Sequence, residues 1–181
     1  MLVGRGPVNR VVTRLKVMLN WLRKRHAPQT GWSANAYLTD DKIVLHSCSR
    51  TYNNRGWYNQ PVFVCSADSE PATIGDFLRS ALIGSVWDSR TDDSQLTPHP
   101  VYHEAGFDSW RSLERNSHMV MTNSDRKTIS IVPTRRVSKG AGRGFSGLDE
   151  QSFVLEWDCD NTELGSAVRS AFKLSLANTC G

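Results

Sequence analysis

The sequence predicts an α+β domain in which a mainly antiparallel sheet is covered by two principal helices. Several short runs of strand-forming residues follow one another through turns of a few residues, which favours antiparallel pairing. Residues 72–84 and 162–175 repeat apolar side chains at helical spacing, so each helix has one face to lay on the sheet. A chain of 181 residues is long enough for one sizeable core, while two full domains would be cramped.

The first elements are predicted from alternating apolar residues and turn composition. Residues 36–38 and 43–46 flank the polar residues 39–42, so we expect a β-hairpin. A polar and aromatic loop over residues 49–59 leads into a strand at residues 61–65. We therefore expect three strands before the first principal helix.

The next elements are bounded by proline, glycine and capping residues. Pro71 and Gly84 are suited to the two ends of the first principal helix. Residues 88–108 are rich in aspartate and proline and predict a long loop, after which Ser109 can cap a short helix.

The last elements complete the sheet and its cover. Strands are expected over residues 119–122, 128–133 and 153–157, and either Asn161 or Thr162 is expected to cap the last helix. The two principal helices are expected to bury the apolar residues that share one face: Ile74, Phe77, Leu78, Leu164, Val168 and Phe172.

The charge is divided unevenly along the chain. The net charge is +4, but residues 1–25 contain 7 of the 22 basic residues and no acidic residue. The remaining 15 basic residues face all 18 acidic residues, so residues 26–181 have a net charge of −3. We therefore predict a basic amphipathic arm or helix over residues 1–30 and a single globular domain over residues 31–181. Such an arm can pack on the domain, lie on a membrane or bind nucleic acid.

Cysteine usage and hydropathy favour the cytoplasm. Cys48, Cys65, Cys159 and Cys180 include no C-x-x-C pair, and no secretory signal precedes them, so we expect reduced thiols. No apolar run approaches the roughly 18 residues of a membrane span.

The motifs that resemble catalytic or binding sites lack the neighbouring secondary structure or the number of ligands that such sites need. Gly140, Gly142 and Gly144 precede a predicted strand, whereas a phosphate-binding loop needs a helix start to follow it. His99 and His103 are interspersed with prolines, so the two imidazoles need not share a helix face, and the ligand number is short. No G-x-S-x-G or catalytic cysteine signature occurs. We therefore predict no catalytic residue, metal, cofactor or small-molecule substrate.

The second half of the chain carries a recognisable order of small signatures. These are Ser109-Trp110, Leu113, the strands at 119–122 and 128–133, the glycine-rich segment 139–145 and the closing helix at 164–172. This layout resembles the immunity proteins of bacterial contact-dependent growth inhibition (CDI) systems over about residues 32–175. The resemblance implies a stoichiometric binding protein that clamps one cognate toxin domain, often a nuclease, and blocks its catalytic surface. We accordingly predict a 1:1 complex with a toxin C-terminal domain.

Candidate toxin-binding residues fall into two chemical groups. One is acidic and would complement the basic substrate groove of a nuclease: Asp88, Asp92, Asp93, Asp158 and Asp160. The other has the residue types that dominate interface energetics: Arg50, Arg55, Trp57 and Tyr58. Two alternatives stay open, because acidic runs are usually solvated surface and the two aromatic residues can instead face the core. A further alternative is a nucleic-acid-binding protein that uses the N-terminal arm and the basic stretch at 126–143.

Overall fold

The structure is a computed structural model that describes residues 31–51, 56–88, 100–137 and 144–178. At residues 50, 51, 56–59, 87 and 88 only the backbone is described. The predicted arm, residues 1–30, lies outside the described residues.

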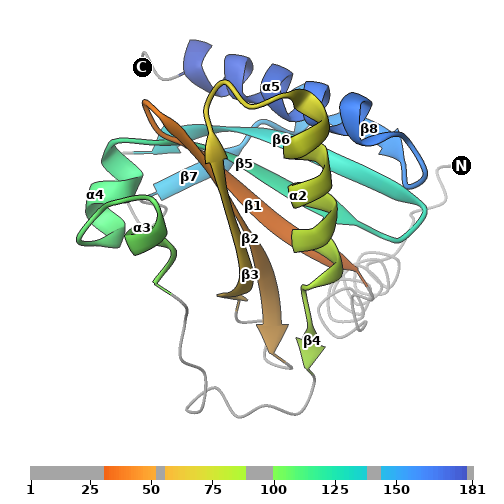
Figure 1. The fold of residues 1–181 in the computed structure, drawn as a ribbon, viewed down its shortest axis with the longest axis horizontal. Helices are drawn as coiled ribbons and strands as arrows, with labels where there is room; N and C mark the ends of the chain where they lie inside the picture. Colours follow the sequence, from red (N-terminus) through yellow and green to blue (C-terminus); the bar gives the residue numbers. More distant parts are fainter. Residues whose placement is uncertain (1–30, 52–55, 89–99, 138–143, 179–181) are drawn as a thin grey trace, which may run out of the picture. The chain divides into compact units, whose positions relative to one another are not determined.

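The described residues form an eight-stranded sheet with the order β3-β2-β1-β5-β6-β7 (Figure 1). Of the other two strands, β4 pairs with β2 and β8 pairs with β6. The strands are β1 (Trp32–Leu38), β2 (Lys42–Thr51), β3 (Gly56–Ser66), β4 (Trp87–Asp88), β5 (His118–Ser124), β6 (Thr128–Val137), β7 (Gly144–Gly147) and β8 (Phe153–Glu156). All pairings are antiparallel except that of β4 with β2. The predicted α+β class and its mainly antiparallel sheet are confirmed.

Helices lie on both faces of the sheet. The two long helices, α2 (Pro71–Ile83) and α5 (Asn161–Ala177), cover one face together (Figure 1). The short helices α3 (Val101–Glu104) and α4 (Trp110–Arg115) pack against the other face. A single 3-10 turn, η2 (Asp149–Gln151), precedes β8.

Strand alternation divides the core into two clusters. Ala36 in β1 and Leu45 in β2 belong to the cluster under α2 and α5, while Tyr37 and Val44 belong to the cluster under α3 and α4. Successive side chains of a strand point to opposite faces, so β1, β2, β3 and β5 each contribute to both clusters.

The predicted helix core is correct at five of its six positions. Ile74, Leu78, Leu164, Val168 and Phe172 are each at most 2% exposed. Phe77 is only partly buried, and its ring stacks on that of Phe63 with centroids 5.0 Å apart. The difference arises because Phe63 belongs to β3, the last strand at that edge of the described sheet.

Four local predictions differ from the structure. Most of the predicted loop at 49–59 belongs to strands, because β2 runs on to Thr51 and β3 begins at Gly56. The predicted loop at 88–108 contains α3, because Pro100 stands at the N-cap, where a helix does not need the missing N–H. The cap of α5 is Asp160, whose carboxylate accepts a hydrogen bond from Glu163 N, rather than Asn161 or Thr162. Strand β7 was not predicted, because glycine-rich segments are poor strand formers. The predicted Ser109 cap is confirmed by a hydrogen bond from Ser112 N, 3.2 Å long.

Two glycines allow α2 and α5 to approach closely. A Cβ atom at Gly165 would lie 2.6 Å from the carbonyl carbon of Pro71 and closer still to its oxygen. A Cβ atom at Gly75 would lie 2.7 Å from the carbonyl carbon of Asn161. Both distances are below any van der Waals contact, so only glycine fits at either position.

Candidate functional site

The predicted anchor residues converge, by their backbones, at one end of the sheet. At this end of β2, Cys48 pairs with Tyr58 and Ser49 pairs with Trp57. Arg50 and Thr51 pair with Trp87 and Asp88 of β4. The strand register therefore brings together the backbones of Arg50, Trp57, Tyr58 and Asp88. Three further members of the two predicted groups, Arg55, Asp92 and Asp93, lie outside the described residues.

The remaining acidic candidates lie on the turn between β8 and α5, residues 157–160, which we call the acidic turn. Asp158 and Asp160 are both exposed there, and Glu156 and Glu163 are exposed on either side. Asp160 also has a structural role, since its carboxylate accepts the 2.7 Å hydrogen bond that caps α5. The carboxylate of Asp158, in contrast, takes no part in capping α5.

Arg79 of α2 holds the acidic turn in place. Its guanidinium donates hydrogen bonds to the carbonyl oxygens of Trp157 and Cys159, the latter at 2.6 Å, and to Asn161 Oδ1 at 3.0 Å. The same guanidinium lies 5.0 Å from the centroid of the Trp157 ring. A planar fork of donors suits several oxygens at once, so one side chain fixes the path of the turn.

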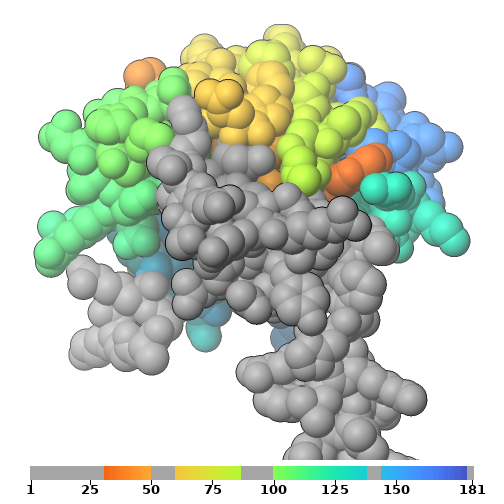
Figure 2. All heavy atoms as spheres, turned by 90° about the horizontal axis from the view of Figure 1, so that it is seen from below, coloured from red at the N-terminus to blue at the C-terminus, as the bar shows by residue number. Residues whose placement is uncertain are grey.

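The aromatic residues beside the acidic turn form a row with two arginines. The rings of Trp157 and Trp32 have centroids 4.7 Å apart, and the guanidinium of Arg126 lies 4.8 Å from the centroid of Trp32. We call Arg126, Trp32, Trp157 and Arg79 the Arg/Trp row. Seen from below, the start of β1 (orange), α2 (yellow-green), the β5–β6 turn (turquoise) and the acidic turn (blue) lie side by side (Figure 2).

The anchor strands and the acidic turn occupy the same end of the sheet. Ser33, next to Trp32, donates its N–H to Ser85 Oγ at 3.0 Å. Val86 donates its N–H to the hydroxyl of Ser49, which precedes Arg50, at 2.9 Å. The segment after α2 therefore connects β1 and β2 between the two predicted groups of candidates, which were far apart in the sequence.

The sequence did not predict the Arg/Trp row because its four members come from four separate segments. Trp32 starts β1, Arg79 lies in α2, Arg126 lies in the β5–β6 turn and Trp157 follows β8. No spacing along the chain relates them. The one available signal was the abundance of tryptophan and arginine, which are the residue types enriched in binding surfaces.

Substitution of Arg79 by lysine is expected to lower the free energy of unfolding by about 1–3 kcal/mol, because an ammonium group cannot satisfy three acceptors in one plane. Urea unfolding of Arg79→Lys against the wild type measures this. Arg111→Lys is the matched control, since Arg111 is exposed on α4 and should change the free energy little. Equal losses in the two variants would contradict the role given to Arg79.

The pKa values near the acidic turn follow from hydrogen bonding and burial. Burial raises the pKa of the Cys159 thiol, and the adjacent Arg79 offsets part of that rise. The backbone N–H groups of Thr128 and Lys127 donate to the Asp125 carboxylate and lower its pKa. At neutral pH the thiol is therefore protonated and the carboxylate is ionised.

One cysteine and one histidine come close to the geometry of a nucleophile and its base. Cys48 Sγ lies 3.9 Å from His46 Nδ1. The same nitrogen lies 2.9 Å from the carbonyl oxygen of Ser47, which can only accept, so Nδ1 carries a proton. A protonated Nδ1 cannot take the thiol proton, and this contact does not make a catalytic dyad.

Metal-ligating side chains are dispersed over the described ranges. Within them, no group of three or more His, Cys, Asp or Glu residues is placed to hold a metal ion. His99 lies outside the described residues, and His103 is exposed on α3. Among the described helices, none is long and apolar enough to cross a membrane.

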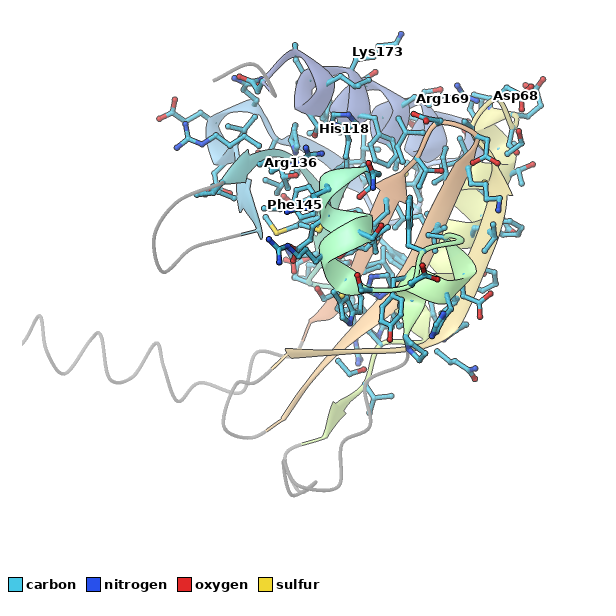
Figure 3. The ribbon with its side chains drawn as sticks, turned by 90° about the vertical axis from the view of Figure 1, so that its left-hand side faces the viewer. Asp68, His118, Arg136, Phe145, Arg169 and Lys173 are labelled. Carbon is cyan, nitrogen blue, oxygen red and sulfur yellow. The ribbon has the colours of Figure 1, made fainter. Side chains whose placement is uncertain are left out.

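The described part of the basic stretch at 126–143 is divided between the two ends of β6. Arg126 precedes the strand and Arg136 lies near its other end, roughly 30 Å away at about 3.3 Å per residue. Arg136 donates to the carbonyl oxygen of Ser117 at 2.9 Å and lies beside His118 and Phe145 (Figure 3). Burial and the nearby Arg136 lower the pKa of His118. The described arginines of this stretch therefore form two separate patches.

The fold and surface together define an α+β domain that presents aromatic, arginine and acidic side chains at one end of its sheet. Residues 99–175 match the family model described as CdiI, the CDI immunity protein. This segment contains α3, α4, β5 to β8 and most of α5. The resemblance predicted from the sequence is confirmed.

Solved structures share the fold at low sequence identity. One is a protein of unknown function, NMB0488 from Neisseria meningitidis, with a TM-score of 0.63 and 19% identity over 82% of this chain and 97% of that chain. Another is a chain of the CdiA-CT/CdiI toxin and immunity complex from Yersinia pseudotuberculosis, with a TM-score of 0.60 and 17% identity over the same shares of both chains. Among curated proteins, no match is found.

Proposed function

We propose that this protein is an immunity protein that binds one cognate CDI toxin domain and neutralises it by covering its active surface. The observation that carries the proposal is the match of residues 99–175 to the CDI immunity family model. The shared fold with a chain of a toxin and immunity complex supports it. The function is stoichiometric binding, so it needs no catalytic residue, metal, cofactor or small-molecule substrate, and it would be exercised in the cytoplasm.

We propose that the toxin contacts the end of the sheet where the two groups of candidates meet. The candidate contacts are Arg50, Arg55, Trp57, Tyr58, Asp88, Asp92, Asp93, Asp158 and Asp160. Of these, Asp158 and Asp160 lie on a turn that Arg79 fixes, so their positions are set before a partner arrives. Preorganised side chains lose less conformational entropy on binding, which favours a tight complex.

We propose a nuclease as the toxin because of the charge of this surface. Glu156, Asp158 and Asp160 are exposed within five consecutive residues. A nuclease must present a basic groove to its substrate, and complementary charge raises the rate of encounter. The acidic turn would then occupy the position of nucleic-acid phosphates in that groove.

The wild-type protein is expected to protect cells that express the cognate toxin domain and to form a 1:1 complex with it. Reversing both Glu156 and Asp158 to lysine should slow association and weaken its dependence on salt concentration, because steering acts on the association rate. Stopped-flow binding at several ionic strengths measures both effects. Asp108→Lys is the control, since Asp108 is exposed between α3 and α4 at the other face.

Two outcomes would contradict the proposed function. One is that the wild-type protein neither binds the toxin domain nor protects cells. The other is tight binding to DNA or RNA that falls on deletion of residues 1–25, which would favour the nucleic-acid-binding alternative.

A further inference from the structure

Arg126 has a backbone conformation that disfavours its own residue type. Its φ is +74°, and no other described residue except glycine has a positive φ. Side chains with a Cβ are strained in this left-handed region, whereas glycine adopts it at no steric cost. An exposed turn position with this φ is therefore expected to hold glycine or asparagine, unless another side chain has a binding or structural role there.

The β5–β6 turn does not require an arginine side chain. Asp125 Oδ1 closes the turn by accepting from Lys127 N at 2.9 Å and Thr128 N at 2.8 Å. Arg126 contributes its backbone N–H to Ser124 Oγ at 3.1 Å, which any residue except proline can do. The fold thus uses the backbone of Arg126, while the side chain extends over Trp32.

The guanidinium of Arg126 is held against an aromatic ring and remains exposed. Arg79, at the other end of the Arg/Trp row, is partly buried and donates to oxygens of the acidic turn and of Asn161. Arg126 is exposed and lies 4.8 Å from the Trp32 centroid. An arginine fixed on a tryptophan loses little side-chain entropy on binding, and these two residue types dominate interface energetics.

Exposed acidic side chains lie on the segments next to Arg126. Thr128 pairs with Glu156, and Trp157 N donates to Lys127 O at 2.7 Å, which brings the acidic turn to the β5–β6 turn. Asp125, Glu156 and Asp158 are all exposed in this region. These carboxylates would repel a run of nucleic-acid phosphates. A basic protein surface that also carries one acceptor for the Arg126 guanidinium is complementary both to the carboxylates and to the arginine.

We propose that Arg126, supported by Trp32, is an anchor of the toxin interface and donates to carboxylate or carbonyl oxygens of the toxin domain, next to contacts made by the acidic turn. This inference rests on the proposed function, because it names the contact that the same surface makes with the same partner. It extends the interface to two residues outside the predicted candidates.

The test uses Arg126→Gly in the full-length chain. This variant removes the side chain and relieves the left-handed backbone, so its thermal unfolding midpoint should equal or exceed that of the wild type. Its Kd for the purified toxin domain should rise by about tenfold or more, mainly through faster dissociation. Lys127→Ala is the matched control, because it removes a neighbouring exposed positive charge and should leave the dissociation rate nearly unchanged.

The outcomes separate this inference from the proposed function. A wild-type protein that binds the toxin domain, together with an Arg126→Gly variant that binds it equally well, overturns the anchor and leaves the immunity function standing. A lower unfolding midpoint in Arg126→Gly shows a structural role and also overturns the anchor. Failure of the wild-type protein to bind the toxin domain overturns both.

Discussion

Replacing Gly165 with alanine is expected to destabilise the domain by more than about 4 kcal/mol, a loss at the upper end of what single substitutions cause. The added Cβ would lie 2.6 Å from the Pro71 carbonyl carbon and 3.0 Å from Gly75 N. These are backbone atoms of α2, so no side-chain rotation relieves the overlap. The two helices would have to separate and expose Leu78, Leu164 and other residues of the larger core cluster.

Intrinsic helix propensity and the close helix approach predict opposite changes in stability for Gly165→Ala. Alanine is the better helix former by about 1 kcal/mol, so without the close approach the substitution would stabilise α5. Urea unfolding monitored by circular dichroism measures the change. Ser166→Ala is the control, because Ser166 is the next residue of the same helix and is exposed. An unchanged or raised free energy of unfolding in Gly165→Ala would show that the helices do not approach as described.

Truncating Phe172 to alanine is expected to lower the free energy of unfolding by about 3–5 kcal/mol, the range observed for fully buried aromatic residues. Phe172 is 2% exposed and lies in the core cluster between α5 and the sheet. Phe77→Ala is the matched comparison, since Phe77 is partly buried against Phe63 and should cost clearly less. Equal losses in the two variants would place both rings in equivalent environments and contradict the described packing.

The fold was largely predictable because its elements follow local periodicity. Ile74 and Leu78, or Leu164 and Val168, stand four residues apart and define a helix face from sequence alone. Boundaries were less predictable where several neighbouring residues can all cap a helix. Asp160, Asn161 and Thr162 are all competent caps, and the backbone path after β8 selects Asp160.

The candidate site was predictable only in part because it is assembled across the sheet. Asp158 and Asp160 stood out as an acidic run, and the structure confirms their exposure without testing their role. Arg79 gave no signal, since an arginine on a helix is ordinarily solvated surface, and only tertiary packing brings it under the acidic turn. When side chains that act together lie on separate segments, their proximity can be predicted only after the strand pairing is known.

The way in which Arg79 holds the acidic turn has a consequence for how binding specificity can diverge. Of the three oxygens that accept from Arg79, two belong to the main chain, at Trp157 and Cys159, and every amino acid offers such an oxygen. The exposed side chain at position 158 can therefore be exchanged while the path of the turn is kept, and position 160 can change among capping residues such as serine or asparagine. A lineage could alter the partner recognised by this surface through substitutions at the turn alone, without rebuilding the fold beneath it.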